Sequence, residues 1–537
     1  MAETAIPSST PIQSKSTPFP HVSLPQNIGL VGVIVFGVQC VSLASAGLLP
    51  FSTVAGIYPG ANLAGILAVA LVFCLLHAYC YALIGVAAPF SGADYVLSTR
   101  VMAPPLGFVS SWTLVLLTGM AAGSMEALIP QSILPTLFST ASIVLQNQTM
   151  ASLAIYIQTP QGILAIGTTV TVIAFMLTVI PQKTMLRILY IGLILGLAAW
   201  AVIYYQLAKA DVSNFITAWD RFMGTGSFSK QIQLATAQGM TLDTSLDTMI
   251  SAGGLMGFWI FSGYYIATLF AGEVKKPEVN LVRGSLLSLV ITGAVLIGAV
   301  LLMNRLATPQ WISAQSYLFQ LNQHTGAGPW IIFYAAILNP NLFLVIFVAL
   351  AWLWMMINLV QTFMYGCSRI ILAWAEDGLA PQIFRYVHPG MRTPMFAVLL
   401  VAILVQIGTS LSASSGVLTG QMNFVFFAVI SQIIPVLSLT LLPFKNKELF
   451  ARAPQIIRRK LGPLPLISLV GGLTLFYFGH ILVTAFTIPK MSKPVALDSI
   501  ILLSIIIVIG FLWFWIFWVR SRRLGENPAE KFKALPE

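Results

Sequence analysis

Two apolar segments of this chain carry small residues in their middles, where a membrane helix can open and expose backbone groups to a solute. The first segment, 33–51, contains the triplet 45–47 (Ser-Ala-Gly), and the second, 255–270, contains Ser262 and Gly263. A helix in lipid must satisfy its own backbone hydrogen bonds, so an opening is tolerated only where the freed groups face protein, water or a ligand. Two openings in corresponding positions of the two halves of a chain are typical of a transporter's substrate site.

The first opening offers groups of both polarities to a ligand. If the helix unwinds at Ser45, Ala46 and Gly47, its outer half begins with free N–H groups, which together with the helix dipole attract an anion such as a carboxylate. Its inner half ends with free carbonyls, which accept hydrogen bonds from an ammonium group. The alternative interpretation of the triplet is a packing site, because small residues let helices approach closely.

The second opening is flanked by aromatic side chains. Phe258, Trp259 and Phe261 precede it, and Tyr264 and Tyr265 follow it. Such rings could cover a bound solute and exclude water, although packing in the core is the commoner role of an aromatic stripe. Because the two openings occur as a pair, we favour a substrate site.

Some polar residues inside predicted spans are candidates for coupling transport to an ion. An ionisable residue at the centre of a membrane costs ~2.5 kcal/mol or more and by default indicates function, so Glu126 is a candidate proton carrier or substrate ligand. The alternative is that Glu126 lies near the outer interface, where water solvates it. Thr362, with Asn358, is a candidate oxygen ligand for a sodium ion. His77 and His480 are lone histidines, to which we assign no role.

The composition is that of an integral membrane protein. Of the 537 residues 58% are hydrophobic and 8% are charged, and the mean hydropathy is +0.89. A spanning helix needs about 20 mostly apolar residues. Twelve segments qualify: 28–58, 62–88, 102–132, 161–181, 185–207, 248–271, 283–304, 329–365, 394–411, 419–442, 464–488 and 498–519. The eighth is too long for one straight span, so we predict that it starts with a short re-entrant or surface piece.

These segments predict an all-α integral membrane protein with about 12 transmembrane helices, of which the first and the sixth are broken. The two openings are five spans apart, and an odd separation places the two halves in opposite orientations. We therefore predict two inverted five-helix repeats, 28–207 and 248–442, and two extra C-terminal helices within 464–519. Together they form one transmembrane domain, 28–520.

Both termini are predicted to be cytoplasmic. Residues 1–27 are rich in Ser, Pro and Thr and contain no apolar core of a signal peptide, so we expect a disordered tail. Residues 521–537 form the second tail. Of the 27 Lys and Arg residues, alternation through twelve spans places only six outside: Lys209, Arg221, Lys230, Arg305, Lys490 and Lys493. This asymmetry follows the positive-inside rule for a multi-pass protein of the cell membrane. It also explains the net charge of +11. We therefore expect no nucleic acid as a partner.

Four stretches of the chain resemble the amino acid–polyamine–organocation (APC) family of permeases. They are 45–47, 89–112, 258–280 and 368–394, the last containing the letters AEDGLAP, and they occur in the family's order. The resemblance covers about residues 28–440. It implies the inverted-repeat fold and the transport of amino acids or related amines by alternating access.

The resemblance also assigns roles to the residues at the two openings. It implies that Ser45, Ala46 and Gly47 bind the substrate carboxylate. It further implies contacts with the amine or side chain from four residues of the second opening: Trp259, Phe261, Ser262 and Gly263. The chain departs from the family at Tyr265, where many members have Glu, and in 188–205, which lacks the lysine of some proton-coupled members. The coupling ion, H+ or Na+, is therefore open.

From the sequence we expect a secondary active transporter of amino acids or related amines, without catalytic residues. We expect no cofactor beyond a coupling ion. The four cysteines all fall in apolar stretches, which argues against a disulfide framework or a zinc site. The alternatives are an intramembrane enzyme that uses Glu126 and His77, or a sensor that kept the fold without transporting. The sequence leaves open whether the protein forms a homo-oligomer.

Overall fold

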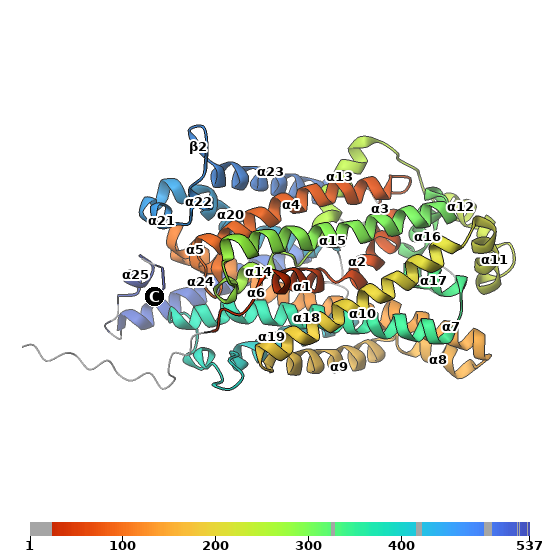
Figure 1. Cartoon of the computed structure of the whole chain (residues 1–537), viewed down its shortest axis with the longest axis horizontal. Coiled ribbons are helices and arrows are strands. Elements are labelled where there is room, and N and C mark those ends of the chain that lie inside the picture. The colour runs from red at the N-terminus through yellow and green to blue at the C-terminus, as the bar shows by residue number, and fades with distance from the viewer. Residues whose placement is uncertain are drawn as a thin grey trace, which may run out of the picture.

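The chain folds into a bundle of long helices that run roughly along the longest axis of the molecule (Figure 1). The computed structural model describes residues 24–323, 328–414, 421–487, 497–523, 525, 527–533 and 535–536. Most of the predicted tail 1–27 therefore lies outside the described residues. Two short strands, β1 (Lys460–Leu461) and β2 (Leu464–Pro465), form an antiparallel hairpin.

Eleven helical segments of the described residues are long and apolar enough to cross a membrane, which confirms an all-α integral membrane protein. Seven are single helices: α4 (Leu63–Ala87), α9 (Pro160–Val179), α10 (Gln182–Lys209), α15 (Pro277–Leu306), α18 (Leu342–Glu376), α19 (Met395–Ser414) and α23 (Leu466–Thr487). Two more lie within α20 (Gln421–Lys445) and α24 (Leu497–Arg523).

The other two of the eleven are composite. The first span joins α1 (Leu30–Val41), α2 (Leu43–Leu49), a π-helical turn (Pro50–Val54) and α3 (Ala55–Ile57). The third joins α6 (Pro104–Glu126), a π-helical turn (Ile129–Ile133) and α7 (Leu134–Leu145). The twelfth expected segment, 248–271, is present as α13 (Leu246–Ile260) and α14 (Ile266–Leu269), each too short to span alone because the helix opens between them.

Short helices cover the two ends of the bundle. They are α5 (Ala93–Val101), α8 (Gln148–Tyr156), α11 (Val212–Met223), α12 (Ser227–Ala237), α16 (Pro309–Gln320), α17 (Ile331–Leu338), α21 (Lys447–Arg452), α22 (Gln455–Arg458) and α25 (Pro528–Lys531), with 3₁₀ turns at Ala271–Glu273 and Gln382–Arg385. In Figure 1, α11, α12 and α16 lie at one end, and α21, α22 and α25 lie at the other, which the sequence predicts to be cytoplasmic.

Side-chain caps define where several helices begin. A side-chain oxygen accepts a hydrogen bond from a backbone N–H two or three residues ahead, at Asn62, Thr159, Ser245, Thr308 and Asn341. Such a cap satisfies an N–H group that has no partner within the helix and contributes about 1 kcal/mol. The cap at Asn341 separates α18 from α17, which confirms the expected short piece at the start of 329–365.

Two predicted segments end more than ten residues later in the structure than the sequence indicated. The third span continues to Leu145 instead of 132, because a π-helical turn accommodates Pro130 without ending the helix. α18 continues to Glu376 instead of 365, because the side chains of its last turns are buried in the protein. A prediction based only on where the sequence becomes polar therefore placed the C-terminal ends of both segments too early.

The spanning helices pack in two groups, and the first span contacts both. α4 packs on α13 and α15, and α1 packs on α15. α6 packs on α18, α19 and α20, and α9 packs on α18 and α19. α1 also contacts α10 and α18, so the opening in the first span lies between the groups. The inverted-repeat relationship between the halves stays a prediction.

Candidate functional site

The first span opens at Ser42, between α1 and α2. Ser42 has φ 54° and ψ 104°, and its N–H donates to the carbonyl of Val38, which ends α1. The predicted opening at 45–47 is therefore wrong by three residues, since these residues lie inside α2. The Ser45 hydroxyl lies 3.2 Å from the carbonyl oxygens of both Val41 and Ser42 and donates to them. A hydroxyl one turn ahead thus stabilises the opening, and the small triplet does not itself unwind.

The break in the sixth span is where the sequence placed it. α13 ends at Ile260, α14 begins at Ile266, and the residues between them form turns. Gly263 has φ +113°, a conformation that side chains rarely adopt. The prediction of a broken sixth helix with Gly263 at its centre is confirmed.

The two openings touch each other. A Cβ atom on Gly263 would lie 2.7 Å from the carbonyl oxygen of Cys40, in the last turn of α1, and 2.8 Å from its carbon. Real Cβ atoms do not come this close to backbone. Glycine at position 263 is therefore required both by its φ angle and by the approach of α1.

A small cavity lies between the openings, with about 20 Å³ open to the centre of a water molecule. Three of the predicted site residues line it: Ser45, Trp259 and Ser262. The indole N–H of Trp259 is buried and has no hydrogen-bond acceptor within the described part of the chain. The lining contains no charged side chain.

Eight further residues line the cavity, and sequence reasoning did not assign them to the site. They are Cys40, Val41, Leu49, Ala121, Met125, Ile260, Leu359 and Phe363. Cys40, Val41 and Ile260 lie next to the openings, so their proximity in sequence was a usable signal. Those on α6 and α18 are apolar residues in apolar helices, and only the packing of these helices brings them to the site.

The other residues predicted for the site lie around the cavity without lining it. A Cβ atom on Gly47 would lie 2.5 Å from the ring of Trp200 and 3.2 Å from that of Trp352. Gly47 is thus a close-packing position, as in the alternative interpretation of the triplet. Ala46 and Phe261 are fully buried. Their substrate contacts stay predictions.

Glu126 is fully buried at the end of α6, next to the cavity-lining Met125. Its Oε1 accepts a hydrogen bond of 3.0 Å from the hydroxyl of Thr171 on α9, and Thr409 on α19 also donates to it. The alternative that water solvates Glu126 at the outer interface is wrong, because protein surrounds it. A coupling role for Glu126 stays a prediction.

The candidate sodium ligands lie on α18, close to the cavity. The Thr362 hydroxyl donates to the carbonyl of Leu359, one turn earlier in the same helix, at 2.8 Å. Asn358 is fully buried, and neither atom of its amide has a partner among the described residues. A Cβ atom on Gly192 would contact this amide and would lie 3.0 Å from the amide nitrogen of Gln39 on α1.

A buried ion pair lies on the side of the openings that the sequence predicts to be cytoplasmic. Arg369 Nε lies 2.8 Å from Glu273 Oε1, and both side chains are 1% exposed. Glu273 also accepts hydrogen bonds from Tyr365 at 2.5 Å and from Gln182 at 2.7 Å. The N–H of Ile28 donates to the backbone carbonyl of Glu273 at 3.0 Å. The start of the first span, α10, α18 and the turn after α14 are thus joined at one point.

The opposite side is covered by α16, which packs on α3 and on the π-helical turn before it. Gln320 donates to the carbonyl of Ser52 at 2.7 Å, and the N–H of Gly60 donates to the Ser313 hydroxyl at 3.1 Å. Contacts between elements thus lie on both sides of the cavity, toward each end of the bundle.

Comparison with known proteins gives a matching family and a relative. A family model described as amino acid permease matches residues 28–512. The mouse protein solute carrier family 7 member 13 is 24% identical over 376 residues, which cover 67% of this chain and 66% of the mouse protein. The match therefore spans just under two thirds of that relative's length.

Proposed function

Since the chain belongs to the amino acid permease family, we propose that it is a secondary active transporter that moves an amino acid or a related amine across the cell membrane by alternating access. The observation that carries the proposal is the contact of the two broken helices, Gly263 against Cys40, beside a small cavity that both helices line. Paired broken helices near the middle of the membrane are the usual substrate site of such transporters.

The substrate's carboxylate is assigned to the start of α2. Because the break is at Ser42, the first N–H groups without helical acceptors are those of residues 43–45, while the N–H of Ala46 already donates to Ser42. The helical path continues through the π-helical turn to Ile57, and its dipole also favours an anion here. The carboxylate contact thus moves from 45–47 to 43–45.

The amine is assigned to the carbonyls at the end of α1 and at the break of the sixth span, which lie together at Cys40 and Gly263. The uncharged lining supports a substrate with a neutral side chain, because a charged one would lack a partner in a dry site. The cavity is smaller than an amino acid, so Trp259 or Phe363 has to move when the substrate binds.

The closed contacts at both ends support an occluded conformation. Outward opening would separate α16 from α3, and inward opening would separate Glu273 from Arg369. Net transport in one direction needs an ion that binds with the substrate. Glu126 is the candidate for a proton, and Thr362 with Asn358 is the candidate for sodium.

The enzyme alternative gains no support from the geometry. His77 forms a hydrogen bond of 2.6 Å with Tyr264, whereas Glu126 is bonded to Thr171 and Thr409. No group of three or more His, Cys, Asp and Glu side chains that could hold a metal ion is present in the described residues. Catalysis usually needs several converging groups. A sensor would bind the same substrate with the same fold but would not transport it.

The direct test is uptake by the purified chain in liposomes. A thermal-shift screen against the twenty amino acids first identifies ligands, since a ligand at 100 times its dissociation constant stabilises the folded state by about 2.7 kcal/mol. The best ligand, in labelled form, is then offered to liposomes that contain the protein and an unlabelled internal pool. Exchange of label across the membrane is expected. Tight binding without exchange would instead identify a sensor.

A further inference from the structure

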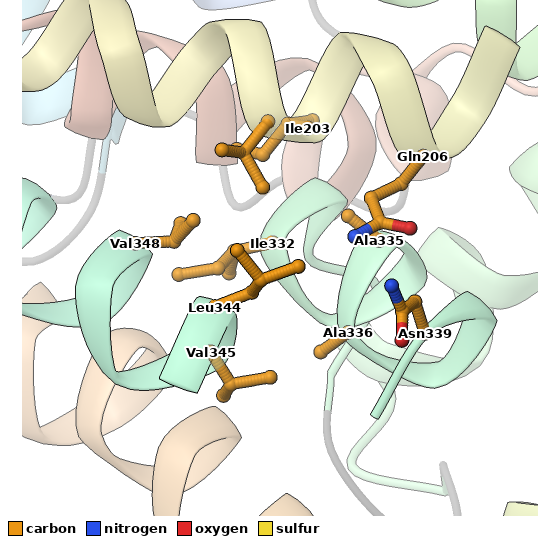
Figure 2. Close-up of a pocket in the computed structure, with 10 residues that line it drawn as sticks. Ile203, Gln206, Ile332, Ala335, Ala336, Asn339, Leu344, Val345 and Val348 are labelled. Atoms are coloured by element: carbon orange, nitrogen blue, oxygen red, sulfur yellow. The ribbon is translucent and has the colours of Figure 1, made fainter. Parts of the chain in front are cut away.

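A second crevice lies outside the substrate site, between α10, α17 and the first turns of α18. Its walls are apolar, and Figure 2 shows Ile203, Ile332, Val345 and Val348 pointing into it. The neighbouring side chain of Phe343 is 77% exposed, so the chain leaves an apolar surface uncovered beside the crevice.

One end of the crevice is polar. Figure 2 shows the amide groups of Gln206 and Asn339 at this end, on the opposite side from Val345 and Val348. The same two residues line a second and larger pocket, with about 430 Å³ open to water, which also contains Lys209 and Arg221. An apolar crevice and a basic pocket thus share a wall.

Both cations are available to a ligand. Neither Lys209 nor Arg221 has a carboxylate within 4.0 Å among the described residues, and Lys209 lies 5.9 Å above the ring of Tyr205. The nearby Arg305 donates instead to the carbonyls that end α10. Asp211 accepts hydrogen bonds from residues of its own helix, α11, and does not line the pocket.

We propose that the crevice and the basic pocket together bind a phospholipid with an acidic headgroup. The crevice has about 20 Å³ open to the centre of a water molecule, so an acyl chain lies along its outer opening, where it contacts the half-buried Leu344. The headgroup lies between Lys209 and Arg221, and the amide of Gln206 donates to the ester or phosphate oxygens. Apolar walls and two unpaired cations fit the two ends of such a lipid and no purely polar or purely apolar ligand. The site is independent of the transport function.

The headgroup is tested with the purified full chain in detergent, by native mass spectrometry with phosphatidylglycerol and with phosphatidylcholine. Phosphatidylglycerol is expected to bind more tightly. Lys209→Gln and Arg221→Gln are each expected to weaken it about fivefold, since one cation near a membrane surface contributes about 1 kcal/mol. The matched control is Lys230→Gln, which removes an exposed cation from α12 outside the pocket and is expected to change nothing.

The acyl chain is tested separately. Leu344 is half-buried at the crevice, so Leu344→Trp fills the crevice without a change of charge and is expected to weaken phosphatidylglycerol at least fivefold. Leu301→Phe, on an exposed face of α15, is the control.

Four results would each overturn the proposal. They are equal binding of the two lipids, an equal loss in Lys230→Gln, unchanged binding in Leu344→Trp, and competition by glycerol 3-phosphate at the concentration of the lipid. The last would mean that the basic pocket binds a free phosphate.

Discussion

The carbonyl oxygen of Cys40 faces the α-carbon of Gly263 so closely that a Cβ atom there would lie 2.7 Å from it. The last turn of α1 and the break of the sixth span therefore form one structural unit. A movement of either helix has to move the other or separate the pair, and the cavity lies at this contact.

We predict that Gly263→Ala abolishes high-affinity substrate binding. The methyl group would strain a backbone with φ +113° and collide with Cys40, at a cost of about 1–3 kcal/mol, and the break would have to change shape. The measurement is the substrate-induced thermal shift. Gly472→Ala in α23, where a Cβ would meet nothing within 4 Å, is the control. Wild-type affinity in Gly263→Ala would remove the proposed site.

Gly47 is predicted to affect stability more than substrate affinity. Gly47→Ala pushes a methyl group against the ring of Trp200, 2.5 Å away, and overpacking of this kind costs about 1–3 kcal/mol. A lower melting temperature is expected, with substrate affinity retained by the properly folded fraction. Trp200→Phe makes room, so the double variant should recover stability. A loss of affinity without a change in stability would instead support the contact with the substrate carboxylate that the resemblance implies for Gly47.

These two glycines show what the sequence could predict and what it could not. Most spans followed from runs of apolar residues, and the break at Gly263 followed from a Ser-Gly pair inside an apolar segment together with a second small-residue site in the other half of the chain. The opening at Ser42 has no comparable mark, because serine is not a residue type that favours a φ of 54°. The partners of Glu126 are 45 and 283 residues away in sequence, at Thr171 and Thr409, and meet it only in the fold.

We predict that the buried pair of Glu273 and Arg369 keeps the cytoplasmic side closed. Arg369→Gln leaves Glu273 buried without its counter-ion, and breaking a buried pair in this way costs about 3–5 kcal/mol. Cys40, which lines the cavity, should then react faster with a small membrane-permeant thiol reagent. Arg452→Gln breaks an exposed pair with Glu448 and should change neither the stability of the protein nor the reactivity of Cys40. Unchanged reactivity of Cys40 in Arg369→Gln would show that the pair is not a gate.

The orientation can be tested with single cysteines. All four native cysteines are buried, so the background with a bulky impermeant thiol reagent should be low. Lys230→Cys on α12 should react from outside intact cells, whereas Lys447→Cys on α21 should react only after permeabilisation. The expectation follows from the excess of basic residues on the side of α21. The reverse pattern would show that the orientation of the protein in the membrane is opposite to the predicted one.

The last prediction concerns the coupling ion. Glu126→Gln should abolish accumulation driven by a pH gradient but keep exchange of substrate for substrate. Exchange can run with a permanently neutral side chain, whereas accumulation requires a group that loads and releases a proton. Glutamine can still hydrogen-bond to Thr171 and Thr409, so the variant should fold.

The measurement is uptake into liposomes with an imposed pH gradient, compared with exchange in the same liposomes. Glu448→Gln, which alters an exposed carboxylate, is the control and should behave as wild type. If Glu126→Gln responds to the gradient as wild type does, Glu126 is not the proton carrier. Sodium then becomes the candidate ion, and Thr362→Val should raise the sodium concentration needed for half-maximal uptake, because it removes a hydroxyl oxygen beside the cavity.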